Sequence, residues 1–233
     1  MSQKLPLMLL PGLLCDAALW QHQVNSLITM ADCQVADLTQ HETMTSLARA
    51  VLSAAPPQFA LAALSMGGYV ALEIMRQAPE RVIKLCMLDT SARADTPEQK
   101  ERRRLLLVMS QSGKFKGVTP RLLPLLIHPA RMDDKELTAT IFAMAERVGR
   151  EAFHRQQTAI LNRIDSHASL KQIKCPVSVI CGRQDVLTPP EITREIADGI
   201  SGAEFTIIED SGHLTALERP ERVNQIMKKW LAG

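Results

Sequence analysis

Three residue types that cooperate in nucleophilic catalysis occur in this chain, each just after an apolar segment typical of a buried strand. They are Ser65, Asp185 and His213, in that order along the sequence. A serine hydroxyl becomes a good nucleophile when a histidine removes its proton, and a buried carboxylate holds that histidine in place. The pattern therefore predicts covalent acyl transfer, with Ser65 as nucleophile, Asp185 as orienting acid and His213 as base.

The segment around Ser65 has the layout of a strand, a tight turn and a helix. The apolar run 59–64 precedes the serine, and Gly67 and Gly68 follow it. Such a turn lifts the hydroxyl off the end of a sheet and points the N-terminus of the next helix towards it. Small residues are needed because strand and helix nearly touch there. Ala63 replaces the glycine usual before the serine, which is a mild departure because a methyl group is small.

Acyl transfer also needs N–H donors for the oxyanion of the tetrahedral intermediate. The backbone amide of Met66, directly after the nucleophile, is predicted to be one of them. The second is expected from the loop after the first apolar strand, where Gly12 allows the turn to bring the amide of Leu13 inward. Cys15 adjoins this loop, and we interpret it as a small apolar filler rather than a second nucleophile.

Other residues compete for the roles of acid and base. Asp89 also follows an apolar run, so it is the alternative acid, although capping of the next turn explains it equally simply. His128 and His167 are alternative bases, and His128 lies in a segment that can line a pocket. The position of Asp185 just after the strand preceding that of His213 favours Asp185 over Asp89.

These residues must be positioned by a sheet, because apolar strands alternate with amphipathic helices along most of the chain. This alternation predicts an α/β fold, a mostly parallel central sheet with helices on both faces. The carboxyl ends of parallel strands share one edge, so the loops that hold the candidate residues should gather there. The predicted strands are 7–10, 34–38, 59–64, 82–88, 173–182 and 205–208.

The pattern changes between residues 92 and 162, where strand-like runs vanish and helical patterns take over. Thr96 and Gln99 form a capping-box signature at the start of one helix, and Gly113 is its predicted end. We interpret the charge run 100–104 within this helix as one solvated face. Further helices are expected at about 121–127, 133–148 and 150–162. Residues 1–91 and 163–233 are therefore predicted to form the core, and 92–162 a helical cap inserted over the sheet edge.

Composition limits the classes of function. The 233 residues are 46% hydrophobic and 22% charged, which suits one soluble domain with an insertion. A net charge of +2 argues against nucleic-acid or membrane-surface partners. Five cysteines without a C-x-x-C pair or zinc-like spacing indicate reduced thiols in the cytoplasm and no metal site. The apolar segment 5–14 resembles a short signal peptide, but prolines interrupt it and no small-residue cleavage site follows, so export is not expected.

With these residues in view, the chain resembles the α/β-hydrolase superfamily over nearly its whole length. Within it, the chain is similar to small capped carboxylesterases, a branch that includes the pimeloyl-ester esterase of biotin synthesis and 3-oxoadipate enol-lactonases. One departure is Pro11, which replaces the histidine usual before the oxyanion-loop glycine. The segments that carry the resemblance are 9–12 with Trp20, 64–68, 181–185 with 188–190, and 211–214 with 218–220.

The resemblance implies a helical cap between the sixth and seventh strands, a catalytic triad and no cofactor. Carried over residue by residue, it places the nucleophile, the acid and the base on Ser65, Asp185 and His213. It places the oxyanion amides on Leu13 and Met66.

The sequence thus predicts a serine hydrolase that acts on a small or medium carboxylic ester, a small-molecule substrate. A thioesterase or an enol-lactonase on the same triad is the close alternative, and a non-catalytic ligand receptor on this fold is the distant one. No cofactor, metal, nucleic acid or membrane is expected, and the oligomeric state stays open. Leu, Ile and Met of the cap should form an apolar pocket, with Arg121, Arg131 or Arg147 recognising a substrate carboxylate or facing solvent.

Overall fold

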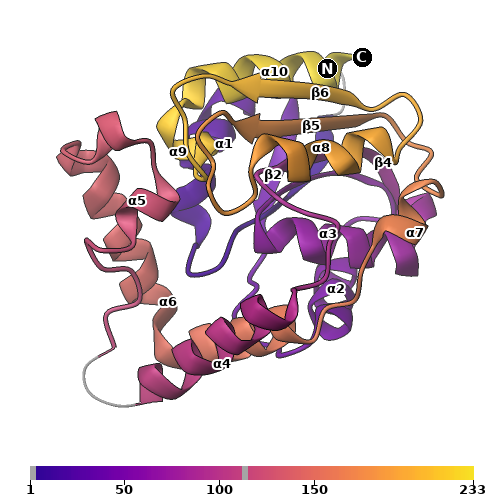
Figure 1. The fold of residues 1–233 in the computed structure, drawn as a ribbon. Helices are drawn as coiled ribbons and strands as arrows, with labels where there is room; N and C mark the ends of the chain where they lie inside the picture. Colours follow the sequence, from indigo (N-terminus) through magenta and orange to yellow (C-terminus); the bar gives the residue numbers. More distant parts are fainter. Residues whose placement is uncertain (1–3, 112–114) are drawn as a thin grey trace.

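The fold is given by a computed structural model, which describes residues 4–111 and 115–233. Within these residues, six strands form one sheet in the order β2-β1-β3-β4-β5-β6, and every neighbouring pair is parallel (Figure 1). The parallel α/β sheet predicted from the sequence is therefore confirmed. The strands are β1 (Leu5–Leu10), β2 (Ala31–Val35), β3 (Phe59–Leu64), β4 (Val82–Leu88), β5 (Val177–Gly182) and β6 (Glu204–Ile208).

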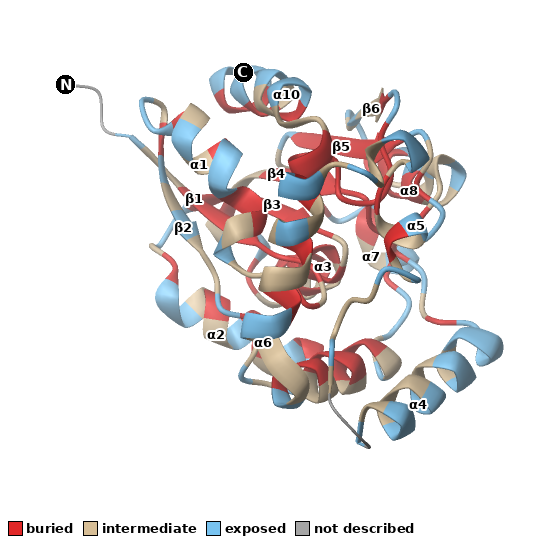
Figure 2. Cartoon of the chain, turned by 90° about the vertical axis from the view of Figure 1, so that its left-hand side faces the viewer, coloured by how far each residue is buried: buried red, intermediate tan, exposed pale blue. Residues whose placement is uncertain are grey.

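Helices cover both faces of the sheet, because each strand presents alternate side chains to opposite sides. One apolar cluster joins one face to α2 (Met44–Ala54), α3 (Met66–Gln77) and α8 (Pro190–Asp198). A second cluster joins the other face to α1 (Gln21–Leu27), α9 (Thr215–Glu218) and α10 (Pro220–Ala232). The strands at the centre of the sheet are consequently buried, as Figure 2 shows.

The chain between β4 and β5 is mostly helical, and we call residues 92–162 the helical segment. It contains α4 (Pro97–Gln111), α5 (Leu123–Leu126), the short 3₁₀ helix η3 (Pro129–Arg131) and α6 (Lys135–Leu161). In Figure 1 these helices lie together at the left and bottom of the view, away from both termini. The resemblance implied an insertion between the sixth and seventh strands. In this chain the helical segment lies between the fourth and the fifth of the six described strands.

Local signals account for most helix boundaries. Thr96 and Gln99 exchange the two hydrogen bonds of a capping box at the start of α4. Gly149, with φ of 75°, interrupts the helical backbone of α6, so the predicted break between residues 148 and 150 is present as a kink. Gly113, the predicted end of α4, lies outside the described residues. The remaining short helices are η1 (Ala17–Trp20), η2 (Pro79–Arg81) and α7 (His167–Leu170).

The largest differences from the predicted strand boundaries are at the second and fifth strands. The second strand was expected at 34–38 but spans Ala31–Val35, and the fifth begins at Val177 rather than at residue 173. Leu38 is buried beyond the end of β2, so its apolar side chain belongs to the following loop and not to the strand. Among the described residues, no helix has the length and apolar character required to cross a membrane.

Candidate active site

Ser65 lies in a strained turn between β3 and α3. Its backbone has φ of 54° and ψ of −115°, a conformation that costs a non-glycine residue about 1–3 kcal/mol. The turn is tied to the next strand, because Ser65 N donates to Leu88 O at 3.0 Å and Thr90 Oγ1 donates to Ser65 O at 2.7 Å. A Cβ on Gly67 would lie 2.4 Å from Leu10 O, so only glycine fits there.

Strain of this kind gathers at one edge of the sheet. Among the described residues, non-glycine residues with positive φ are Leu14, Ser65, Asp89 and Asp210. Each lies in a loop that follows the carboxyl end of a strand, namely β1, β3, β4 or β6. Strained backbone persists where surrounding structure holds it in place, and it often marks functional sites. This edge is therefore the candidate active site.

The structure brings the three predicted catalytic side chains into one hydrogen-bonded chain. Nε2 of His213 lies 2.8 Å from Oγ of Ser65, and Nδ1 of His213 lies 2.8 Å from Oδ2 of Asp185. The His213 and Asp185 side chains are buried, and Ser65 is partly accessible. This geometry allows His213 to take the Ser65 proton while Asp185 holds the other ring nitrogen.

Asp185 is held by donors other than the histidine. Its Oδ1 accepts from the backbone amides of Leu187 at 2.8 Å and Thr188 at 3.0 Å. Its Oδ2 accepts from Oγ1 of Thr188 at 2.7 Å as well as from His213. With four donors around it, the carboxylate is stabilised in its charged form and fixed in orientation.

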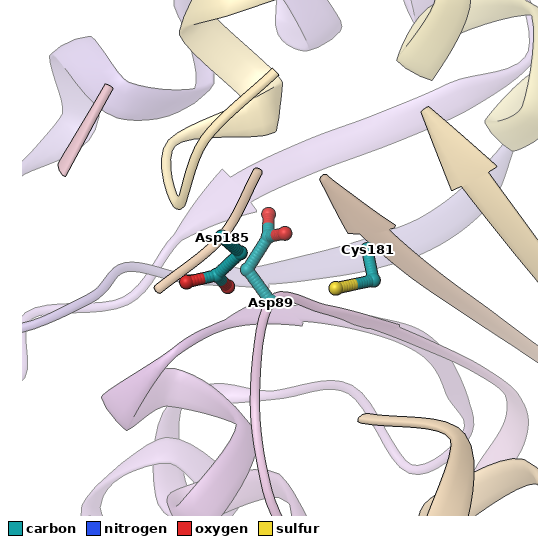
Figure 3. Close-up of side chains that lie close together, drawn as sticks. All are labelled: Asp89, Cys181 and Asp185. Atoms are coloured by element: carbon teal, nitrogen blue, oxygen red, sulfur yellow. The ribbon is translucent and has the colours of Figure 1, made fainter. Parts of the chain in front are cut away.

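Asp89, the alternative acid, is placed beside Asp185 but without a hydrogen bond to His213. Oδ1 of Asp89 accepts from Gly182 N at 2.8 Å, and its other oxygen is hydrogen-bonded to Oγ1 of Thr215. Figure 3 shows Asp89, Asp185 and Cys181 close together, with one ligand atom of each within 4.8 Å of the others. Both carboxylates are hydrogen-bonded to protein groups, and the Cys181 thiol lies near two carbonyl oxygens. These contacts account for the cluster without an added ion.

The pKa values of the two carboxyls are shifted in opposite directions. Burial opposes ionisation of Asp185, but the imidazole of His213 and the hydrogen bonds from Thr188 outweigh it and lower its pKa. Burial and the neighbouring Asp185 charge raise the pKa of Asp89 well above its ordinary value. For His213, burial favours the neutral ring, yet Asp185 reverses this and raises its pKa. The surroundings thus favour the charged form of Asp185, the partner of the histidine, and the neutral form of Asp89.

The loop of the predicted oxyanion donor lies directly against the nucleophile. A Cβ on Gly12 would be 3.4 Å from Cβ of Ser65. The amides of Leu13 and Met66 donate to no acceptor among the described residues, so both remain available to a ligand. The next amide, that of Leu14, donates to Oε1 of the buried Gln156 at 3.1 Å. The helical segment therefore braces this loop through α6.

A cavity of about 330 Å³ opens beside these residues and is lined by Ser65 and His213. Its wall combines the loop 12–15 and the loop 91–96 with side chains from α4, α5 and α6. Apolar residues supply much of the wall. They include Leu106, Leu122, Leu125, Ile141, Met144 and Phe153, all from the helical segment.

Several other predicted residues lie elsewhere. His167 is hydrogen-bonded to Asp165 and Glu195, and Nδ1 of His128 accepts from the Ala130 amide, so neither reaches Ser65. Cys15 lines the cavity, and burial together with the Asp16 charge raises its pKa to about 12, which suits a filler. The suggested carboxylate-binding arginines Arg121, Arg131 and Arg147 do not line the cavity.

Two groups of site residues were missed from the sequence. Glu218 accepts from the amides of Gly212 at 2.8 Å and His128 at 2.6 Å, and so ties the His213 loop to the helical segment.

Arg103 belongs to the charge run 100–104, which was predicted to be one solvated face. This prediction is wrong for Arg103, whose side chain is 21% exposed and lines the cavity with Arg163. The adjacent glutamines at 156 and 157, which closely precede the apolar residues 159–161, were the available signal.

Known proteins resemble this chain in sequence and in fold. Residues 9–226 match the model of the alpha/beta hydrolase family. A Mycobacterium tuberculosis protein named as a non-heme bromoperoxidase, BpoC, is 32% identical over 177 residues, which cover 73% of this chain and 66% of that protein. This chain thus spans about two thirds of that relative's length.

Two further matches cover nearly the whole chain. A pimeloyl-[acyl-carrier protein] methyl ester esterase of Nitrosomonas europaea is 25% identical over 93% of this chain and 91% of its own. The solved structure of a thermophilic esterase from Thermogutta terrifontis superposes with a TM-score of 0.89 at 29% identity, and covers 99% of this chain and 90% of that one.

Proposed function

The chain belongs to the alpha/beta hydrolase family, and on this basis we propose that it is a serine hydrolase that cleaves small or medium carboxylic esters. The observation that carries the proposal is the continuous chain of contacts from Ser65 through His213 to Asp185, with 2.8 Å at each step. It opens into a cavity large enough for a small molecule. Esterases among the similar proteins support the same reaction class.

In the proposed mechanism, Oγ of Ser65 attacks the ester carbonyl carbon as Nε2 of His213 takes its proton. The Asp185 carboxylate holds the proton on Nδ1 and stabilises the imidazolium that forms. The oxyanion of the tetrahedral intermediate accepts from the amides of Leu13 and Met66, next to the N-terminus of α3. His213 then gives its proton to the leaving alcohol, and the C–O bond of the ester breaks.

The acyl-enzyme on Ser65 is resolved by the same groups in reverse. Nε2 of His213 takes a proton from water, the hydroxide oxygen attacks the acyl carbon, and Ser65 leaves with the proton that His213 returns. General base catalysis of this kind contributes roughly 10²–10⁴-fold to each step. The protein needs no cofactor in this scheme.

We further propose that the helical segment acts as a cap over the substrate. Its apolar side chains on α4, α5 and α6 face the cavity beside Ser65, where they can bury the hydrocarbon part of an ester. Because Gln156 and Glu218 connect this segment to the oxyanion loop and the His213 loop, cap and catalytic residues are mechanically linked.

Hydrolysis of p-nitrophenyl esters, graded from acetate to decanoate, tests the proposal. Wild-type protein should release p-nitrophenol with a preference for one chain length, and Ser65→Ala should be inactive with an unchanged melting temperature. Equal rates for the two proteins would contradict the assigned nucleophile. If the protein cleaved thioesters or lactones but no ester, the ester assignment would be contradicted. If it bound these compounds tightly but cleaved none of them, a receptor would be favoured.

A further inference from the structure

The cavity beside Ser65 contains a charged region that the proposed mechanism does not use. Besides His213, the charged residues in the described part of the chain that line the cavity are Asp95 and four arginines, Arg93, Arg102, Arg103 and Arg163. Arg93 is paired outside the cavity with Glu195, and the side chain of Arg102 is exposed. The buried part of the charged region therefore consists of Asp95, Arg103 and Arg163, which we call the Arg–Asp–Arg cluster.

One carboxylate joins the two guanidinium groups of this cluster. Oδ2 of Asp95 lies 2.5 Å from Nε of Arg103, and Oδ1 of Asp95 lies 2.9 Å from Nη1 of Arg163. The Asp95 side chain is 1% exposed. Among the described residues, no second carboxylate lies within ion-pair distance of either arginine. The cluster thus carries two positive charges and one negative charge.

The two guanidinium groups keep N–H donors that no acceptor among the described residues uses. The side chain of Arg163 is only 7% exposed. Its Nε donates to Arg93 O and its Nη1 to Ile160 O, whereas Nη1 of Arg103 donates to Oε1 of Gln157 at 2.8 Å. Nη2 of each arginine has no acceptor within the described part of the chain. Neither Nη2 is among the fully buried polar atoms without a partner, so both groups keep some solvent access and can donate to an anion that enters the cavity.

The cluster lies at a suitable distance from the nucleophile. Tyr69 follows Ser65 by four residues in α3, a rise of about 6 Å. The guanidinium of Arg163 stacks on the Tyr69 ring, with 4.2 Å from its carbon to the ring centroid. Ser65, Arg103 and Arg163 all line the same cavity. A hydrocarbon chain of several carbons within its apolar part can therefore connect an ester at Ser65 to a group at the cluster.

We propose that Arg103 and Arg163 form a carboxylate-binding subsite, and that the substrate is an ester with a carboxylate remote from the scissile bond. This inference rests on the proposed esterase function. A planar carboxylate can accept from both free Nη2 groups, and the surplus positive charge matches its single negative charge. Asp95 holds the two guanidinium groups together in the absence of substrate.

Paired substrates that differ only in this charge test the subsite. The monomethyl esters of the straight-chain diacids from glutaric to suberic acid are anionic, and their dimethyl esters are neutral. For the wild-type protein and the best chain length, kcat/KM should be about tenfold or more higher for the monomethyl ester than for the dimethyl ester. Acetate esters of ω-hydroxy acids place the carboxylate on the alcohol side, so the two series identify which half of the ester reaches the cluster.

Arg103→Gln is the decisive variant, and Arg104→Gln is its matched control. Arg103→Gln should lower kcat/KM for the preferred anionic ester by about tenfold and leave that of the neutral ester within about twofold. Arg104 is the next residue of the same helix, but its side chain is 57% exposed, is paired with Glu101 and does not line the cavity. Arg104→Gln should change neither rate, and Arg103→Lys should restore part of the preference.

The outcomes separate failure of the subsite from failure of the esterase proposal. Equal turnover of anionic and neutral esters, or an equal loss on both in Arg103→Gln, would overturn the subsite and leave the esterase intact. Calorimetric binding of the monoesters to Ser65→Ala and to Ser65→Ala/Arg103→Gln gives a second readout that needs no turnover. Binding that depends on Arg103 supports the subsite even if no ester is cleaved, and binding by neither protein overturns it.

Discussion

Replacement of Asp185 by asparagine should show that the two buried carboxyl groups, those of Asp185 and Asp89, have different functions. In Asp185→Asn, the amide oxygen can still accept from the amides of Leu187 and Thr188, as Oδ1 of the aspartate does. The NH₂ group then faces Nδ1 of His213 and donates to it. Nδ1 becomes an acceptor, the ring proton moves to Nε2, and the base no longer has a lone pair directed at Ser65.

The size of the effect follows from these contacts. The variant loses both the correct tautomer and the negative charge that stabilises the imidazolium 2.8 Å away. Loss of both is expected to lower kcat by about 10³–10⁴-fold, or about 4–5.5 kcal/mol of transition-state stabilisation. Asp89→Asn should change kcat by less than about tenfold, because the raised pKa of Asp89 favours its neutral form and asparagine can reproduce its bonds to Gly182 and Thr215.

Steady-state hydrolysis of the best p-nitrophenyl ester measures both variants, with circular dichroism as the control for folding. A loss in Asp89→Asn as large as that in Asp185→Asn would refute the assignment of a single acid. Full activity in Asp185→Asn would refute the role of Asp185 altogether.

Three further outcomes are expected. Between pH 5 and 9, kcat/KM should fall as the pH drops through the raised pKa of His213, with a midpoint above about 6.5 because the base must be neutral; in Asp185→Asn the midpoint should move to lower pH. Gly68→Ala should lower the free energy of unfolding by about 1–3 kcal/mol in urea titrations, because its Cβ would lie 2.3 Å from Oγ1 of Thr90. Iodoacetamide at pH 7.5 should leave Cys15 unmodified in the folded protein, as mass spectrometry of its peptide would detect, since burial raises its pKa to about 12.

Strands could be predicted where the pattern of apolar residues in the sequence reflects how deeply the strand is buried. The strands β3 and β4 span the predicted residues, because strands covered on both faces are continuous apolar runs. β2 lies at the edge of the sheet and alternates between buried and accessible residues, so its run of Ala, Asp, Cys, Gln and Val gives a weak signal. The serine turn was recognisable because its close packing requires Gly67 and Gly68.

Contacts between distant residues were not predictable in the same way. Arg103 meets Gln157 across 54 residues, and Gln156 meets the Leu14 amide across 142. A charge run on a helix is usually solvated, and nothing in the run 100–104 distinguishes the arginine that turns inward. That choice depends on Asp95, whose position is fixed by the loop after β4. Pairings of this kind follow from tertiary packing and not from local pattern.

The most direct test of the account is the site of covalent reaction with a fluorophosphonate. Intact-mass and peptide mass spectrometry of the wild-type protein should show a single phosphonyl adduct, on Ser65. Ser65→Ala should remain unmodified, and His213→Ala should react far more slowly because the serine has lost its base. An adduct on another residue, or none on wild-type protein whose fold is intact by circular dichroism, would contradict the assignment of Ser65 as an activated nucleophile.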